Sequence, residues 1–317
     1  MSRKLHKFQT EAEYQAYSAS TDYTTPCVAV VEENNVIYYD YGDNKPHPNY
    51  TDYKVSSKSL VSDGGDTYGL DETLCLNYIP SSVTSLESAF SGWTSLEEVT
   101  CEIPNSVTDM SSTFEGCSSL VNAPEIPSGV TSMSFTFANC SSLVTAPGIP
   151  SGATSMSSTF QGCSSLVNAP KIPNSVMMMS STFQGCSSLV NAPKIPNSVT
   201  SMIHTFHGCS SLVNAPEIPS GVIRMMPSTF YGCSSLVNAP KIPDSVADMS
   251  YTFYDCTSLK EVTFLHTIPP SYSDTLYGCS KLESIYVPDE AVDTYKTATG
   301  WSQFSDKIKP LSSKPSE

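Results

Sequence analysis

The sequence predicts a repeat solenoid, in which one short unit is stacked many times along an axis. The 21 residues from Met156 to Val176 recur unchanged from Met179 to Val199. Apolar residues fall three or four positions apart within each copy, which fits neither an alternating strand nor a sustained helix. A phenylalanine, replaced once by leucine, recurs every 23 or 24 residues, at Phe90, Phe114, Phe137, Phe160, Phe183, Phe206, Phe230, Phe253 and Leu276.

The apolar columns of the repeat predict ladders of like side chains that run through the stack. One unit cannot bury its apolar side alone, so neighbouring units must cover it. We expect adjacent copies about 4.8 Å apart, as in a sheet. Recurring prolines should limit any parallel strand to three or four residues around Leu-Val-Asn-Ala. The segment that ends in Thr-Phe should form one turn of α-helix or 3₁₀-helix. In one copy the inward residues are Ala153, Met156, Phe160, Cys163, Leu166, Ala169 and Ile172.

Two stretches, 81–99 and 195–213, follow the pattern I-P-x-S-V-x-x-(M/L)-x-x-x-F-x-G-C-S-S-L at most of its positions. This pattern resembles the BspA-like leucine-rich repeat of bacterial surface proteins, and residues 282–311 resemble the segment that closes such arrays. The resemblance implies a right-handed coil of about nine 23-residue repeats with short parallel strands. It also implies a role in adhesion or protein recognition, with no catalytic residues. The Ala-Pro in most copies departs from the plain strand of that family.

We divide the chain into residues 1–78, 79–288 and 289–317. The first segment predicts a small α+β module, with a short helix within residues 7–20, capped by Thr10, and a β-hairpin over 27–41. An exposed solenoid end must be covered, so this module should cap the array or attach it to something else, including through assembly of the module. The middle segment is the solenoid, and the last should form a helical cap and tail.

Composition excludes several partners. Acidic residues number 31 against 16 basic ones, a formal charge of -15, which disfavours nucleic acid and anionic lipid. No apolar stretch predicts a secretory signal or a membrane-spanning helix. The sequence therefore predicts synthesis in the cytoplasm and no membrane insertion. It leaves association with a virion or display at a cell surface open.

A cysteine column recurs through the array and invites a chemical role. A ladder places Cβ atoms about 4.8 Å apart, wider than the roughly 3.8 Å of a disulfide. A straight column also supplies no tetrahedral metal site. Since Trp93 fills the same column in the first copy, we interpret these residues as buried free thiols: Cys117, Cys140, Cys163, Cys186, Cys209, Cys233, Cys256 and Cys279. The methionine column four residues before each phenylalanine is interpreted as core in the same way.

Two outward columns are the candidate site. They lie two residues before and one after each phenylalanine and would share a face if that segment were helical. Near the C-terminal end they gather His204, His207, Tyr231, Tyr251, Tyr254 and Tyr277, either as a partner-binding surface or as scattered solvated aromatics. Two histidines alone are too few to indicate a metal, so no metal or cofactor is predicted. A valine column is either an exposed partner surface or half-buried at the proline bend: Val121, Val144, Val167, Val190, Val213 and Val237.

Nothing in the sequence indicates catalysis. Nucleotide-binding, metalloprotease and nucleophile-elbow motifs are absent, and a site of unlike residues that converge once fits poorly with repetition. We therefore expect no enzyme. The sequence favours a recognition or adhesion protein whose solenoid binds a protein or glycan surface. The alternative is a structural virion component, a phage fibre or decoration protein that displays the solenoid from an N-terminal anchor.

Overall fold

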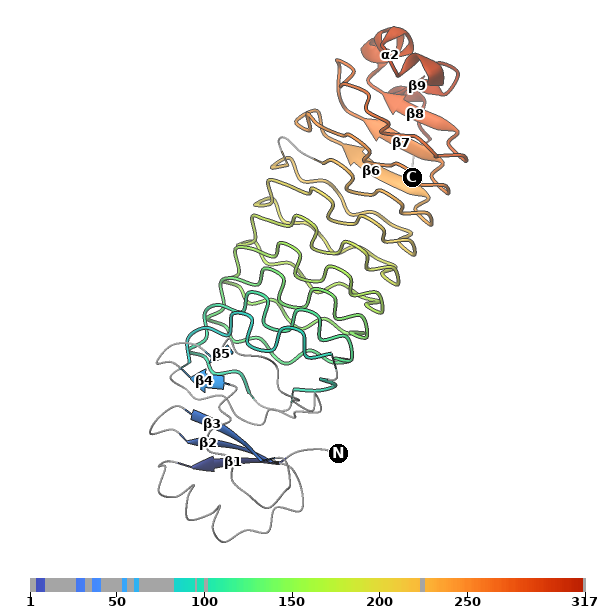
Figure 1. Ribbon diagram of the computed structural model, residues 1–317. Coiled ribbons are helices and arrows are strands. Elements are labelled where there is room, and N and C mark those ends of the chain that lie inside the picture. The colour runs from blue at the N-terminus through green and yellow to red at the C-terminus, as the bar shows by residue number, and fades with distance from the viewer. Residues whose placement is uncertain are drawn as a thin grey trace.

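A computed structural model describes residues 83–94, 96–99, 102–222 and 226–315, together with five N-terminal strands. These strands are β1 (Lys4–Phe8), β2 (Cys27–Val31), β3 (Val36–Asp40), β4 (Tyr53–Val55) and β5 (Leu60–Ser62), paired in that order in one sheet (Figure 1). β1 and β2 are parallel and the other pairs antiparallel. The β2–β3 pair coincides with the expected hairpin. The helix expected after its cap at Thr10 lies outside the described residues; of the stretch 7–20, only Lys7 and Phe8 are described, in β1.

The middle of the chain forms a stack of similar coils (Figure 1). Alternate backbone N–H groups in one copy donate to carbonyls of the next. In the first copy, Ser88 donates to Ser111 and Phe90 to Thr113, each at 2.9 Å. The same bonds recur one repeat later, where Phe114 donates to Thr136 at 2.8 Å. Neighbouring copies are therefore held in fixed register by their backbones, and the predicted repeat solenoid is confirmed.

The segment before each phenylalanine is not the helical turn that the sequence predicted. It is a chain of tight turns, in which Thr113 donates to the carbonyl of Met110 and Glu115 to that of Ser112, each at 3.2 Å. Ser112 has φ 53° and Gly116 φ 76°, and such left-handed residues interrupt a right-handed helix. The left-handed position recurs in every copy, at Ser88, Ser112, Phe135, Ser158, Ser181, His204, Ser228, Tyr251 and Asp274. The interruption leaves alternate N–H groups free to bond the next coil.

Among the described residues of the solenoid, regular strands occur only toward the C-terminal end. They are β6 (Asn238–Ile242), β7 (Glu261–Phe264), β8 (Ser284–Val287) and β9 (Ile308–Pro310), all parallel. Earlier copies have single bridges at the same place, for example between Asn168 and Asn191. Proline lacks the N–H that a strand needs, and the Ala-Pro of those copies is absent from β7 and β8. β6 keeps the Ala-Pro, and its pairing with β7 shifts register between Asn238 and Lys241. The expected three- to four-residue strands are therefore reduced to one-residue contacts in the middle copies.

The predicted inward columns form the core. The phenylalanine rings from Phe90 to Phe253 stack with centroids 5.4–5.7 Å apart and planes within 17° of parallel. The methionines, cysteines and leucines beside them are buried in each copy. Each coil contributes one member to each ladder, so the core is a narrow rod along the axis rather than a central cluster.

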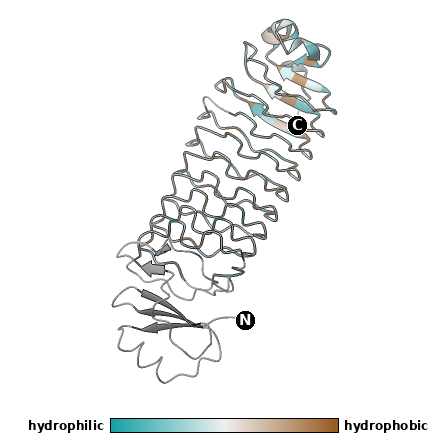
Figure 2. Cartoon of the chain, in the orientation of Figure 1, coloured by the Kyte–Doolittle hydropathy of each residue, from teal (hydrophilic) through white to brown (hydrophobic). Residues whose placement is uncertain are grey.

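The last coil is closed by a compact cap. It contains η1 (Asp289–Ala291), α2 (Val292–Thr297), η2 (Ser302–Phe304) and η3 (Leu311–Ser313) besides β9. Tyr295 and Trp301 are fully buried and meet edge to face at 5.1 Å. The indole of Trp301 donates to the carbonyl of Pro270 at 2.7 Å. Figure 2 shows hydrophobic and hydrophilic residues mixed over this cap. These contacts replace the neighbour that the last repeat lacks.

A column of buried threonines was not foreseen from the sequence. In each copy the hydroxyl donates to a carbonyl of the preceding copy, as Thr159 does to Met133 at 2.7 Å and Thr182 to Met156 at 2.8 Å. These side chains are fully buried: Thr113, Thr136, Thr159, Thr182, Thr205, Thr229, Thr252 and Thr275. The hydroxyls thus add a second line of bonds between coils.

We predict that Thr159→Val lowers the free energy of unfolding by about 0.5–1.5 kcal/mol, the net contribution of one hydrogen bond. Valine keeps the shape of the side chain but loses the bond to the Met133 carbonyl. Denaturant unfolding followed by circular dichroism measures the change. Thr159→Ser, which keeps the hydroxyl, is the control. A valine variant as stable as the native chain would show that the threonine column contributes only packing.

Candidate recognition surface

The two outward columns meet in space because a tight turn joins them. His207 donates its backbone N–H to the carbonyl of His204 at 3.1 Å, and Tyr254 does so to Tyr251 at 3.2 Å. The Nδ1 atoms of His204 and His207 lie 3.4 Å apart, and the rings of Tyr251 and Tyr254 have centroids 6.0 Å apart. A turn, not a helix, therefore brings these positions together.

The rings of successive copies also stack on one another. His207 and Tyr231 have centroids 4.6 Å apart and planes 2° from parallel. Tyr231 and Tyr254 follow at 4.8 Å and 1°, and Tyr254 and Tyr277 at 4.8 Å and 22°. Ring contacts thus connect all six residues singled out from the sequence. We call this set the aromatic face: His204, His207, Tyr231, Tyr251, Tyr254 and Tyr277.

The stacking determines which parts of the rings in the aromatic face a partner can contact. Each inner ring is covered by its neighbours in the stack, while Tyr251 is 43% exposed and Tyr277, at the end of the stack, is 56% exposed. Desolvation raises the pKa of Tyr254, with a further contribution from the carboxylate of Asp255, so its hydroxyl stays protonated and can donate. Burial, with a smaller contribution from His204, lowers the pKa of His207, which keeps this imidazole uncharged at neutral pH.

The preceding copies carry plain residues in the same columns. Ser158 and Ser181 occupy the first column, and Gln161 and Gln184 the second. The backbone there is the same, since Ser181 has φ 55° and His204 φ 53°. The preceding copies therefore present serine and glutamine, in place of aromatic residues, on the same backbone turn.

The valine column is exposed. Val121 and Val144 are 42% and 43% exposed, and Val167, Val190 and Val213 are also exposed, whereas Val237 is half-buried. An asparagine column runs beside it, in which the amide of Asn214 reaches the oxygen of Asn191 at 3.5 Å. We call these six valines the valine stripe. It is a second outward surface, apolar along most of its length.

Residues 76–190 and 177–299 match the family model of the BspA type leucine rich repeat region, with six copies. The chain belongs to this family. Two solved structures are similar to it. One is a leucine-rich repeat protein from Bacteroides ovatus, 21% identical, with 84% of this chain and 76% of that chain covered and a TM-score of 0.46. The other is a leucine rich cell surface protein from Faecalibacterium prausnitzii, 18% identical, with coverage of 87% and 93% and a TM-score of 0.35. The comparison with curated proteins gives no match.

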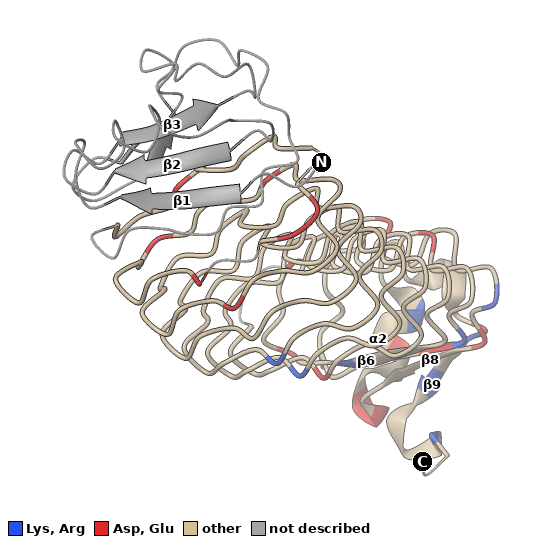
Figure 3. Ribbon diagram, turned by 90° about the horizontal axis from the view of Figure 1, so that it is seen from below, with Lys and Arg blue, Asp and Glu red and all other residues tan. Residues whose placement is uncertain are grey.

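Charge is sparse along this BspA-type array. The sequence has no lysine or arginine between residues 59 and 170, and most of the solenoid ribbon carries no charge at all (Figure 3). The aromatic face itself is flanked by Asp255 and Asp274, which also influence Tyr254. Within the described residues, no helix is long and apolar enough to cross a membrane.

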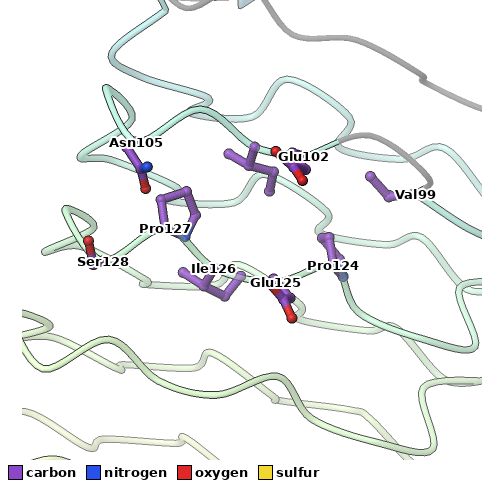
Figure 4. Close-up of a pocket in the computed structure, with 9 residues that line it drawn as sticks. Val99, Glu102, Asn105, Pro124, Glu125, Ile126, Pro127 and Ser128 are labelled. Atoms are coloured by element: carbon purple, nitrogen blue, oxygen red, sulfur yellow. The ribbon is translucent and has the colours of Figure 1, made fainter.

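Shallow furrows repeat between the Ile-Pro turns of successive copies. The larger has a volume of about 630 Å³ and is lined by Glu102, Ile103, Pro124, Glu125 and Pro127 among others (Figure 4). A furrow of about 540 Å³ lies further along, between Ile149 and Lys171. Since the same turn produces both, they are features of the repeat and not a specialised pocket.

The ladder cysteines are free and buried, as predicted. The Sγ–H of Cys163 donates to the carbonyl of Phe137 at 3.1 Å, and the same bond recurs from Cys117 to Cys279. Burial raises the pKa of Cys163 to about 12, so its thiolate is scarcely present at neutral pH. In the described part of the chain, no group of three or more His, Cys, Asp or Glu residues is placed to hold a metal.

We expect the eight ladder thiols to resist alkylation in the folded protein, including at about pH 9, because their pKa values are raised well above the ordinary range. After denaturation without reductant, all eight should react. Mass spectrometry of alkylated peptides measures both states. A ladder cysteine that reacts rapidly before unfolding, or fails to react afterwards, would contradict its assignment as a buried free thiol.

Proposed function

We propose that this BspA-type repeat protein is a non-enzymatic recognition protein that binds a partner protein through its aromatic face. The observation that carries the proposal is the stack from His207 to Tyr277, with centroid spacings of 4.6–4.8 Å. Tyrosine combines a large apolar contact with a hydroxyl that can donate or accept, and it is enriched where protein interfaces gain most affinity.

Rigidity supports this role. Each ring stands on a coil whose backbone is bonded to the next, as Phe206 is to Thr229 at 2.9 Å and Gly208 to Tyr231 at 2.7 Å. The phenylalanines that precede three of these rings in the sequence are stacked in the core. Side chains held in this way lose little conformational entropy when a partner binds. The aromatic face is therefore a preformed surface.

The arrangement favours a protein over a glycan. A sugar ring packs on an open aromatic face, and in this stack neighbours cover the inner rings. Only His207 and Tyr277 end the ladder. The edges, hydroxyls and imidazoles that remain suit hydrogen bonding to a protein. Asp255 and Asp274 and the net charge of -15 favour a basic contact on that partner.

The plain copies provide the substitutions for a test. In the triple variant Tyr231→Gln, Tyr254→Gln and Tyr277→Gln, each ring is replaced by the residue at Gln161 and Gln184. We expect binding to a panel of intact cells to fall at least about tenfold, since loss of each interface anchor typically costs more than 1 kcal/mol. Flow cytometry with the labelled full chain measures binding, and melting temperatures confirm folding.

The control is Val144→Ser with Val167→Ser, which alters the valine stripe and leaves the aromatic face intact. Protease treatment of the cells should abolish binding, whereas glycosidase treatment should not. Binding that the tyrosine substitutions leave unchanged would refute the assignment of the site. Binding that survives protease and is lost with glycosidase would show that the ligand is a glycan.

A further inference from the structure

The first pair of the aromatic face has a geometry that partner contact does not require. The Nδ1 atoms of His204 and His207 face each other at 3.4 Å. The turn bond between the two backbones fixes their separation along the chain, and Tyr231 stacks on His207 at 4.6 Å and holds its ring plane. Both histidines are only partly buried, so solutes can reach them.

This separation matches the bite of a tetrahedral zinc ion. Zinc–imidazole bonds of about 2.0–2.1 Å at the tetrahedral angle place two nitrogens roughly 3.3–3.4 Å apart. A right angle, as in square-planar copper or nickel sites, would bring them to roughly 3.0 Å. The separation of the two Nδ1 atoms therefore matches tetrahedral zinc better than a square-planar metal.

We propose that His204 and His207 form a two-imidazole chelate for Zn²⁺. Both nitrogens then bind the metal as neutral lone-pair donors, and each ring carries its proton on Nε2. Zinc replaces the hydrogen bond by which one Nδ1–H faces the other Nδ1. No third His, Cys, Asp or Glu joins the pair within the described residues. Two coordination positions remain for water or for a donor from another molecule.

Metal ligation requires the neutral imidazole. The inference does not depend on the proposed partner binding, because the two imidazoles can hold zinc whether or not a partner contacts the tyrosines.

Isothermal titration of the full chain with Zn²⁺ at about pH 7.5 tests the chelate. The variants His204→Ser and His207→Gln introduce the residues of the preceding copy, Ser181 and Gln184, on the same left-handed turn. Each single variant should lose at least about tenfold in affinity at this site, since one imidazole alone is a single ligand. The double variant, which lacks both imidazoles, should bind no zinc at this site. It also measures any zinc held elsewhere, including by His6, His47 and the cysteines outside the ladder.

Building the same histidine pair into the preceding copy gives a second test. Ser181→His together with Gln184→His should create a second chelate one copy earlier and raise the zinc stoichiometry by one equivalent. Neither substitution alone should do so. Single loss variants that bind like the native chain, or a double gain variant with unchanged stoichiometry, would overturn the proposal. Melting temperatures close to that of the native chain confirm that the variants are folded.

Discussion

The structure depends on the backbone hydrogen bonds that join each coil to the next. Phe114, Phe160 and their equivalents donate to the carbonyl of a threonine one repeat further on, at 2.8–2.9 Å. This bond requires the same backbone conformation in every copy. A period of 23 or 24 residues keeps the phenylalanines in phase, and the left-handed residue before each one turns alternate N–H groups toward the next coil. Because the backbones of successive copies stack in register, their equivalent side chains stack as well.

Because of these bonds, the inward columns serve stability, and the outward columns are free to serve recognition. A change in an inward column disturbs both neighbours, so these columns repeat phenylalanine, cysteine, threonine and leucine in all but the end copies, where Trp93 and Leu276 occur. Their polar atoms bond to neighbouring carbonyls, as the Cys163 thiol does to Phe137. Outward columns can change one copy at a time, as the step from Ser181 to His204 shows at nearly equal φ. Rings in consecutive copies then stack at the spacing of the coils. The aromatic face thus arises from single substitutions on a frame that does not change.

The buried side-chain ladders could be predicted from the sequence, because they depend only on the length of the repeat. The burial of Cys163 and Phe160 follows from their columns, and Trp93 identified the cysteine column as apolar. The turn at Ser112 could not be predicted, since serine has little intrinsic preference for positive φ and only the bonds between coils impose it. The bonded hydroxyl of Thr159 was missed because threonine in a serine-rich stretch suggests solvent exposure. The 3.4 Å between His204 and His207 depends on side-chain placement, which spacing does not determine.

Native-state hydrogen exchange at the phenylalanine amides measures the bonds between coils most directly. We expect the N–H groups of Phe114, Phe137, Phe160 and Phe183 to be among the slowest to exchange and to exchange together, since each is bonded to the next coil. Rapid exchange of these amides, at rates close to those of an exposed loop, would show that these bonds do not hold the stack together. Side-chain packing would then hold the coils together without the backbone register. The core phenylalanine stack and the aromatic face both depend on that register.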